Sequence, residues 1–253
     1  MLTNFNHLLS EVYDTSCYLN FHVLSQTFLR KHTYRLIGVL VTETELIDVY
    51  NDSGSKIGVK KRGEAHRDGS WHQSFHCWII RREGAHCFIV FQLRGDKVVY
   101  PFLFDITAAG HVRSGETVKE ASREIGEELG LKIRFESLVY LGTRHEAYIL
   151  GEITNREFCE VYLLEDQTPL SRYKLQEKEV AGVFQIELDD FLKLFNGEVN
   201  EVLAEGVVLE SGKLKKIERV VKAEEFIPRK DRYYLLIGIM AERYFEGKKR
   251  FAV

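Results

Sequence analysis

The amino-acid sequence predicts an α+β fold, with a mixed β-sheet and a few separate helices. Runs rich in β-branched and aromatic residues recur from residue 44 onward, and turn-forming residues cluster between them. Helical spacing of apolar residues is confined to a few segments and does not alternate regularly with the strands. A regular strand–helix alternation would predict a parallel sheet, so its absence favours the α+β class.

The strands are recognised by their composition and by the turns between them. They are predicted over residues 45–51, 57–62, 74–82, 85–94, 134–149 and 156–165. Residues 74–82 and 85–94 should form a hairpin of the central sheet that turns at Glu83–Gly84. Helices are predicted over residues 117–129, 187–195 and 228–245. The last of these is expected to have Pro228 near its start, since proline is favoured in the first helical turn.

The chain has 253 residues, and we expect three parts. Residues 42–195 are predicted to form the main domain, and residues 1–41 an N-terminal extension. Residues 196–253 are predicted to pack on the main domain as a hairpin, turning at Ser211–Gly212, and a helix. This C-terminal part is expected either to cap the functional site or to form the contact of a homodimer.

The composition excludes several classes of protein. With 45% hydrophobic and 12% aromatic residues, the chain can form a packed core. A net charge of -3 argues against a general nucleic-acid binder. No run of about 18 apolar residues occurs, so no membrane span is expected. The first Lys or Arg is Arg30, and polar residues interrupt the apolar runs before it, so no secretion signal is expected.

The cysteines show no metal-binding or redox spacing. They are Cys17, Cys77, Cys87 and Cys159. The last three lie inside apolar runs, where buried free thiols are expected. Free thiols fit a reducing compartment, so we expect a cytoplasmic protein.

Acidic residues gather in GHVRSGETVKEASREIGEELGL, residues 110–131. They are Glu116, Glu120, Glu124, Glu127 and Glu128. On a helix over residues 117–129 they would lie along the edge of an apolar stripe formed by Val118, Ala121, Ile125 and Leu129. One interpretation is a solvated helix face, balanced by Lys119 and Arg123. The other is a cation site, because carboxylates beside the carbonyls of a glycine-flanked loop are the oxygen ligands that Mg²⁺ prefers.

The same segment closely resembles the Nudix box, G-x5-E-x7-R-E-U-x-E-E-x-G-U, where U is aliphatic. Its fixed positions are filled by Gly110, Glu116, Arg123, Glu124, Ile125, Glu127, Glu128, Gly130 and Leu131. In one departure, the six residues TVKEAS separate Glu116 from Arg123, where the usual pattern has seven. The resemblance covers about residues 42–195 and implies a Nudix-type α/β/α sandwich.

This resemblance implies an enzyme that hydrolyses a nucleoside diphosphate linked to another moiety, or a related pyrophosphate, with Mg²⁺ or Mn²⁺. The metal ligands it implies are Glu124, Glu127, Glu128 and the carbonyl oxygen of Ala109. Arg123 would orient one of these carboxylates. Glu116 would be an auxiliary ligand or would position water, although the short spacing leaves its placement open.

The general base is not decided by the motif. Glu127 or Glu128, acting on a water beside the metal, is one interpretation. A residue outside the box is the other, with Glu160 and Glu146 as candidates.

The substrate is not named by the box either. Gln92 and Arg94 are candidates to line the path of the pyrophosphate, because Arg forms bidentate contacts with phosphate; a core-packed strand end is the alternative. His111 is a further candidate for substrate binding. The sequence does not distinguish a CDP compound, a nucleotide sugar, ADP-ribose or a dinucleotide.

Two rival functions stay open. Isopentenyl diphosphate isomerases share the Nudix fold and use histidines for a metal site, for which His72 and His111 resemble counterparts. Those enzymes carry a catalytic Cys where this chain has Ala109, and they lack the complete box. A Nudix-fold ligand sensor without turnover would typically have a degraded box, whereas all of its metal-binding glutamates are present here. Singly, His66, His72 and His76 are expected more often to form hydrogen bonds at strand ends than to contact substrate.

Overall fold

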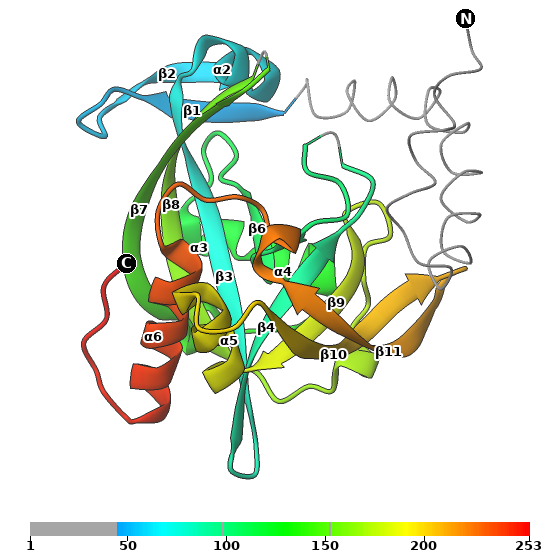
Figure 1. The fold of residues 1–253 in the computed structure, drawn as a ribbon. Coiled ribbons are helices and arrows are strands. Elements are labelled where there is room, and N and C mark those ends of the chain that lie inside the picture. The colour runs from blue at the N-terminus through cyan, green and yellow to red at the C-terminus, as the bar shows by residue number, and fades with distance from the viewer. Residues whose placement is uncertain (1–44, 98, 152) are drawn as a thin grey trace, which may run out of the picture. The chain divides into compact units, whose positions relative to one another are not determined.

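The computed structural model describes residues 45–253 except 98 and 152 (Figure 1). The predicted N-terminal extension and Cys17 lie outside the described residues. The described strands form one 11-stranded mixed sheet, which confirms the α+β class. No helix in this part of the chain is long and apolar enough to cross a membrane.

The sheet is organised around its long central strand. This strand, β3 (Trp71–Glu83), forms the predicted hairpin with β4 (His86–Arg94). Strand β3 also pairs with β6 (Ala108–His111) in antiparallel and with β8 (Ile153–Glu165) in parallel orientation. The parallel β3–β8 pair makes the sheet mixed, and β3 lies at its centre in Figure 1.

The other elements extend the sheet on both sides. The remaining strands are β1 (Leu46–Tyr50), β2 (Lys56–Lys61), β5 (Phe104–Asp105), β7 (Val139–Leu150), β9 (Val180–Glu187), β10 (Glu201–Glu210) and β11 (Lys213–Lys222). The helices are α2 (Arg62–Asp68), α3 (Val118–Ala121), α4 (Arg123–Leu129), α5 (Leu188–Asn196) and α6 (Tyr233–Phe245). Short 3-10 turns occupy Phe135–Ser137, Leu170–Arg172 and Ala223–Glu225. The hairpin predicted at Ser211–Gly212 is confirmed, and β10 joins it to β9.

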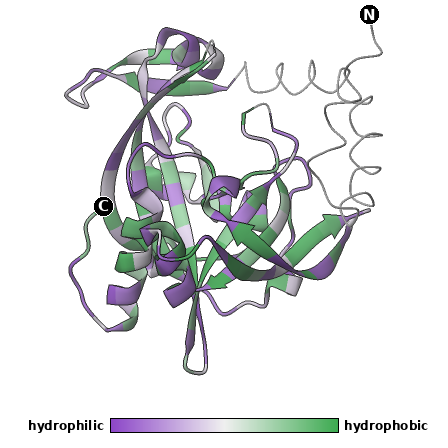
Figure 2. Ribbon diagram, in the orientation of Figure 1, coloured by the Kyte–Doolittle hydropathy of each residue, from purple (hydrophilic) through white to green (hydrophobic). Residues whose placement is uncertain are grey.

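Alternate residues of β3 enter two separate hydrophobic cores, because successive side chains of a strand point to opposite faces. Phe75 and Ile79 enter one core together with Ile125 of α4. Trp78 and Ile80 enter the other core, which α5 and α6 cover. The sheet therefore has helices on both faces, as in an α/β/α sandwich, and Figure 2 shows hydrophobic residues recurring along its central strands.

The prediction of a single helix over residues 117–129 is wrong. The structure has two helices there, α3 and α4, which are separated at Ser122. The Ser122 hydroxyl donates to the carbonyl of Lys119 at 2.6 Å, and the amide of Ile125 donates to the carbonyl of Ser122 at 3.2 Å. Such local bonds tighten the turn and compete with regular helical bonding. The apolar stripe is kept across the break, since Ala121, Ile125 and Leu129 are all fully buried.

Two further helices differ from the prediction: α6 begins later than expected, and α2 was not expected at all. Helix α6 begins at Tyr233, so Pro228 lies before it. Side chains of the intervening residues are held by buried partners: Arg229 contacts Asp105, and Asp231 accepts from Arg144. These tertiary contacts keep the segment out of the helix. Helix α2 was not predicted, because Ala65 is its one buried residue and no apolar period marks it.

The described cysteines are free thiols. Cys77 and Cys159 are buried as predicted, whereas Cys87 is half-buried. Cys87 lies near the start of β4, close to the exposed tip of the β3–β4 hairpin, which explains its partial exposure.

Candidate active site

The acidic segment is held against the sheet through Glu128. Its side chain is buried, and its Oε2 atom accepts from the backbone amide of Ala109 in β6 at 3.2 Å. Gln92 of β4 donates to the same oxygen at 3.4 Å, and Lys97 lies 3.4 Å from Oε1. The backbone of β6 at Ala109 and the carboxylate of Glu128 are therefore parts of one cluster.

Arg123 contacts three of the acids. Its Nε and Nη2 atoms donate to the two carboxylate oxygens of Glu116 at 2.8 and 3.1 Å. Its Nη1 atom donates to Glu124 and, at 2.9 Å, to Glu127. The structure thus brings Glu116 into the cluster despite the short spacing, through a bidentate pair with Arg123. Such pairs have both geometric specificity and strength.

Glycine is required at position 110 by the approach of Glu124. A Cβ atom on Gly110 would lie 2.3 Å from the Cδ atom of Glu124 and 2.5 Å from its Oε1. The carboxylate of Glu124 therefore lies directly over the backbone of β6. We call Glu116, Glu124, Glu127 and Glu128 the acid cluster.

The electrostatics of the acid cluster differ from residue to residue. Burial raises the pKa of Glu124 to about 7, and nearby Glu128 and Glu127 add to the effect against the opposing charge of Arg123. Burial also raises the pKa of Glu128, against the opposing charge of Lys97. For Glu116 partial burial acts in the same direction, but the bonds from Arg123 outweigh it and the pKa is lowered. Two crowded carboxyls thus resist ionisation in the absence of a cation.

The residues present fit a hard divalent cation. The carboxylates of buried Glu128 and partly buried Glu124 approach neighbouring residues of β6, Ala109 and Gly110. Beside Glu128 lies the side-chain carbonyl of Gln92, whose buried oxygen has no hydrogen-bond partner among the described residues. Oxygen donors of this kind suit Mg²⁺ or Mn²⁺.

Of the two residues expected along the substrate path, the structure places only Gln92 at the acid cluster. Arg94 donates from Nη1 to Asp105 at 2.8 Å and from Nη2 to the carbonyl of Val99 at 2.9 Å. The guanidinium thus has partners within the fold, as the core-packed alternative predicts.

The two candidate bases outside the box have other partners. Glu160 of β8 accepts from Tyr140 at 2.8 Å and from Thr143 at 3.1 Å, and both lie on β7. Glu146 is buried and forms ion pairs with Arg144 and Arg229. Among the described contacts, neither glutamate meets the acid cluster.

His111 follows the glycine of the box and joins a different group. It lies near His66, His72 and Glu157, whose ligand atoms are all within 4.8 Å of one another. His76 lies apart from this group, with its Nδ1 atom 3.1 Å from the hydroxyl of Tyr233.

Two residues were missed in the sequence, one beside the acid cluster and one in the group of histidines. Lys97 bridges Glu128 and Glu179 from the loop after β4, and no motif marks it. Glu157 lies on β8 two residues before Cys159, on the inward-facing side of an otherwise apolar alternation. A charged residue at a predicted core position is a signal that could have identified it.

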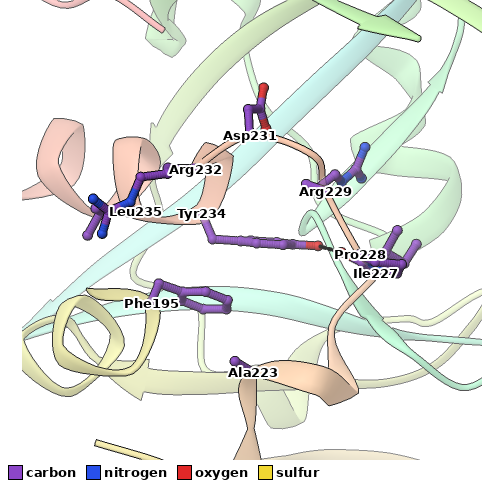
Figure 3. A pocket seen from close by; sticks show the side chains of 9 residues that line it. All are labelled: Phe195, Ala223, Ile227, Pro228, Arg229, Asp231, Arg232, Tyr234 and Leu235. Atoms are coloured by element: carbon purple, nitrogen blue, oxygen red, sulfur yellow. Dashed lines mark hydrogen bonds between the residues drawn. The ribbon is translucent and has the colours of Figure 1, made fainter. Parts of the chain in front are cut away.

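A separate hollow of about 250 Å³ lies between the end of α5 and the start of α6 (Figure 3). The rings of Phe195 and Tyr234 stack there at 4.7 Å, and the Tyr234 hydroxyl donates to the carbonyl of Ile227. None of its lining residues belongs to the acid cluster.

Comparisons with known proteins agree with this geometry. The family model of the NUDIX domain matches residues 70–205. An uncharacterized Nudix hydrolase of Clostridium acetobutylicum is 35% identical over 197 residues, which cover 77% of this chain and 96% of that protein. Nudix hydrolase 3 of Arabidopsis thaliana is 35% identical over 182 residues, or 69% of this chain and 23% of that protein.

An isopentenyl-diphosphate Delta-isomerase of Saccharopolyspora erythraea is 31% identical over 142 residues, or 54% of this chain and 70% of that protein. The family model and the hydrolase relatives together define the class of the protein. The chain belongs to the Nudix family, and it is a hydrolase of pyrophosphate bonds.

Proposed function

We propose that the chain hydrolyses a nucleoside diphosphate linked to another moiety, with Mg²⁺ or Mn²⁺ at the acid cluster and water as the nucleophile. The crowding of Glu124 and Glu128 supports this most directly. Burial raises the pKa of both carboxyls, so a divalent cation would relieve an arrangement that is unfavourable without it. When bound, the cation neutralises charge on the phosphates and activates water.

Each side chain of the cluster has a distinct role in this proposal. Glu124, Glu128 and the carbonyl of Ala109 hold the cation. Glu116 fixes Arg123 through its bidentate contact, and Arg123 in turn orients Glu124. Gln92 holds Glu128 and faces the phosphates.

Glu127 takes the proton from the attacking water. Its side chain is 45% exposed, and its partners Arg113 and Arg123 lie at the rim of the cluster, so it is accessible to water. Glu128, by contrast, is buried and accepts from Ala109 and Gln92. A general base must reach the proton that it removes, which favours Glu127.

The role of Glu127 is tested by Glu127→Gln, which keeps the shape of the side chain and removes the base. We expect kcat to fall by at least about 100-fold, the usual contribution of a general base. The matched control is Glu177→Gln, which changes an exposed glutamate outside the box. Near wild-type turnover in Glu127→Gln, with turnover lost in Glu160→Gln, would place the base outside the box.

The substrate is tested with a panel of CDP compounds, nucleotide sugars, ADP-ribose, dinucleotides and isopentenyl diphosphate, each with Mg²⁺ or Mn²⁺. The proposal predicts metal-dependent release of phosphate or of a nucleoside monophosphate. Binding of a panel member without any turnover would instead identify a ligand sensor.

The similarity to the Saccharopolyspora isomerase supports a second candidate function, isomerisation of isopentenyl diphosphate. Position 109 opposes it, because the side chain there is the methyl group of Ala109, which cannot transfer a proton. Conversion of isopentenyl diphosphate without release of phosphate would favour this candidate over hydrolysis.

A further inference from the structure

Arg113 lies in the loop between β6 and α3, at a position that the Nudix box leaves unspecified. Its guanidinium lies beside two members of the acid cluster. The Nη2 atom is 3.6 Å from Oε2 of Glu127, and the Nη1 atom is 3.8 Å from Oε1 of Glu116. A cation outside the fixed positions of the box is thus next to the glutamate to which we assign the role of general base.

Both of these contacts are ion pairs that are too long to be hydrogen bonds, which join nitrogen and oxygen at about 2.7–3.2 Å. The two glutamates have a closer partner in Arg123, which donates to Glu116 at 2.8 and 3.1 Å and to Glu127 at 2.9 Å. Among the described residues, neither Nη1 nor Nη2 of Arg113 has a hydrogen-bond partner. These two groups are therefore available to a ligand at the edge of the acid cluster.

The rest of Arg113 is held in place. Its Nε atom donates to Oε1 of Glu45 at 3.2 Å, and its backbone amide donates to Oε2 of Glu116 at 3.0 Å. Its backbone also forms an antiparallel β-bridge with Ile47 of β1. Because these contacts already restrict the side chain, less conformational entropy is lost when the terminal groups of the guanidinium bind a ligand.

Three cations form ion pairs with the acid cluster among the described residues, and Arg113 differs from the other two. The side chains of Lys97 and Arg123 are only 17% and 20% exposed. Lys97 bridges Glu128 and Glu179, and Arg123 donates hydrogen bonds to its acids. The side chain of Arg113 is 45% exposed. Arg113 is therefore the cation of this group that a ligand arriving from solvent meets first.

A phosphate group is the ligand that fits Arg113 best. The planar guanidinium presents Nη1 and Nη2 as a pair of donors, which match two oxygen atoms of one phosphate. The proposed substrate brings such a group to the acid cluster, so this step rests on the proposed function.

We propose that Arg113 binds a phosphate group of the substrate through Nη1 and Nη2, while Glu45 holds its Nε atom. Arg113 then sets the affinity of this chain for the pyrophosphate. Its side chain forms no ion pair with Glu124 or Glu128 among the described contacts, so its removal should not weaken the binding of a cation alone.

The test uses the full chain and methylenediphosphonate, a pyrophosphate analogue in which a methylene group replaces the bridging oxygen and prevents hydrolysis. Isothermal titration calorimetry measures the affinity for Mn²⁺ alone and then for the analogue at saturating Mn²⁺. In Arg113→Ala we expect the analogue to bind about 10–100-fold more weakly, the usual effect of losing charge-assisted hydrogen bonds. The affinity for Mn²⁺ alone should not fall.

Two variants serve as comparisons. Arg113→Lys keeps the charge and loses the paired donors, so its affinity for the analogue should lie between those of wild type and Arg113→Ala. The matched control is Arg172→Ala, which changes an exposed arginine outside the box and should bind the analogue as wild type does.

Kinetics separate phosphate binding from an effect on Glu127. With the best substrate of the panel, Arg113→Ala should raise KM by about the same factor as it weakens the analogue, with a smaller change in kcat. A lower kcat with unchanged KM would mean that Arg113 only positions Glu127, and it would overturn the proposal.

The proposal is also overturned if Arg113→Ala binds the analogue within about twofold of wild type, or if its affinity for Mn²⁺ falls by the same factor. Wild-type affinity in Arg113→Lys overturns it as well, which keeps the test decisive if Arg113→Ala folds poorly. A wild-type protein that does not bind the analogue has the same consequence. If the wild-type protein binds the analogue through Arg113 and hydrolyses no panel member, only the proposed hydrolysis fails. If it hydrolyses a panel member and Arg113→Ala binds the analogue normally, only this inference fails.

Discussion

Gly110→Ala should strongly lower the catalytic rate of the protein while it lowers the free energy of unfolding only slightly. The added Cβ would lie 2.3 Å from Cδ of Glu124, whereas ordinary contact begins near 3.4 Å, so the carboxylate must move by about 1 Å. A displacement of this size at a reacting centre costs on the order of 100-fold in rate. Because the atoms that must give way belong to a side chain near the surface, we expect the free energy of unfolding to fall by at most about 1–2 kcal/mol.

The assay compares kcat on the best substrate of the panel, the affinity for Mn²⁺ and the Tm for wild type and variant. The matched control is Gly126→Ala in the same motif, where the nearest atom to a new Cβ is the carbonyl oxygen of Leu131 at 3.4 Å. That change should leave kcat unaltered and stabilise α4 by about 0.5–1 kcal/mol, since alanine is the better helix former. A kcat for Gly110→Ala within about threefold of wild type would refute the placement of Glu124 at the cation.

Three further predictions concern stability. Ile125→Ala, at a fully buried position, should lower the free energy of unfolding by about 2–5 kcal/mol in urea titrations. Arg229→Met should cost about 3–5 kcal/mol, because it leaves the buried carboxylates of Asp105 and Glu146 without that partner; a loss below about 1 kcal/mol would contradict the ion pairing. Burial lowers the pKa of His76 from 6.5 to about 3, so between these values the unfolded chain binds a proton that the folded chain does not, and stability falls as the pH falls. In chelated protein, His76→Gln should remove about 1.4 kcal/mol per pH unit of that slope, and an unchanged slope would contradict the burial of a neutral His76.

The features predicted well from the sequence are those set by nearby residues. The alternation of Phe75, Cys77 and Ile79 with Trp78 and Ile80 marks a strand buried on both faces, and both cores confirm it. The box likewise lies in one continuous segment, so its residues could be assigned to one cluster before their distances were known.

The remaining features depend on contacts between distant parts of the chain. Arg229 meets Asp105 across 124 residues and Glu146 across 83, and no local pattern specifies either partner. The late start of α6 follows from these contacts. The break at Ser122 has a different cause. The hydrogen bond of the Ser122 hydroxyl outweighs the helical preference of the neighbouring residues, and the difference in free energy between the two is too small to predict from composition.

The contacts of Arg123 bear on how a cation would enter the proposed active site. Its guanidinium pairs with Glu124 and Glu127, so a cation held by Glu124 would compete there with a positive charge of the protein itself. Glu116 would still hold Arg123 in that case, because its pair with the guanidinium is bidentate and its pKa is lowered. Glu116, whose placement the short spacing left open, would thus keep Arg123 at the acid cluster when Glu124 turns to a cation. We expect this competition to weaken the binding of a cation to the acid cluster when no substrate phosphate is present.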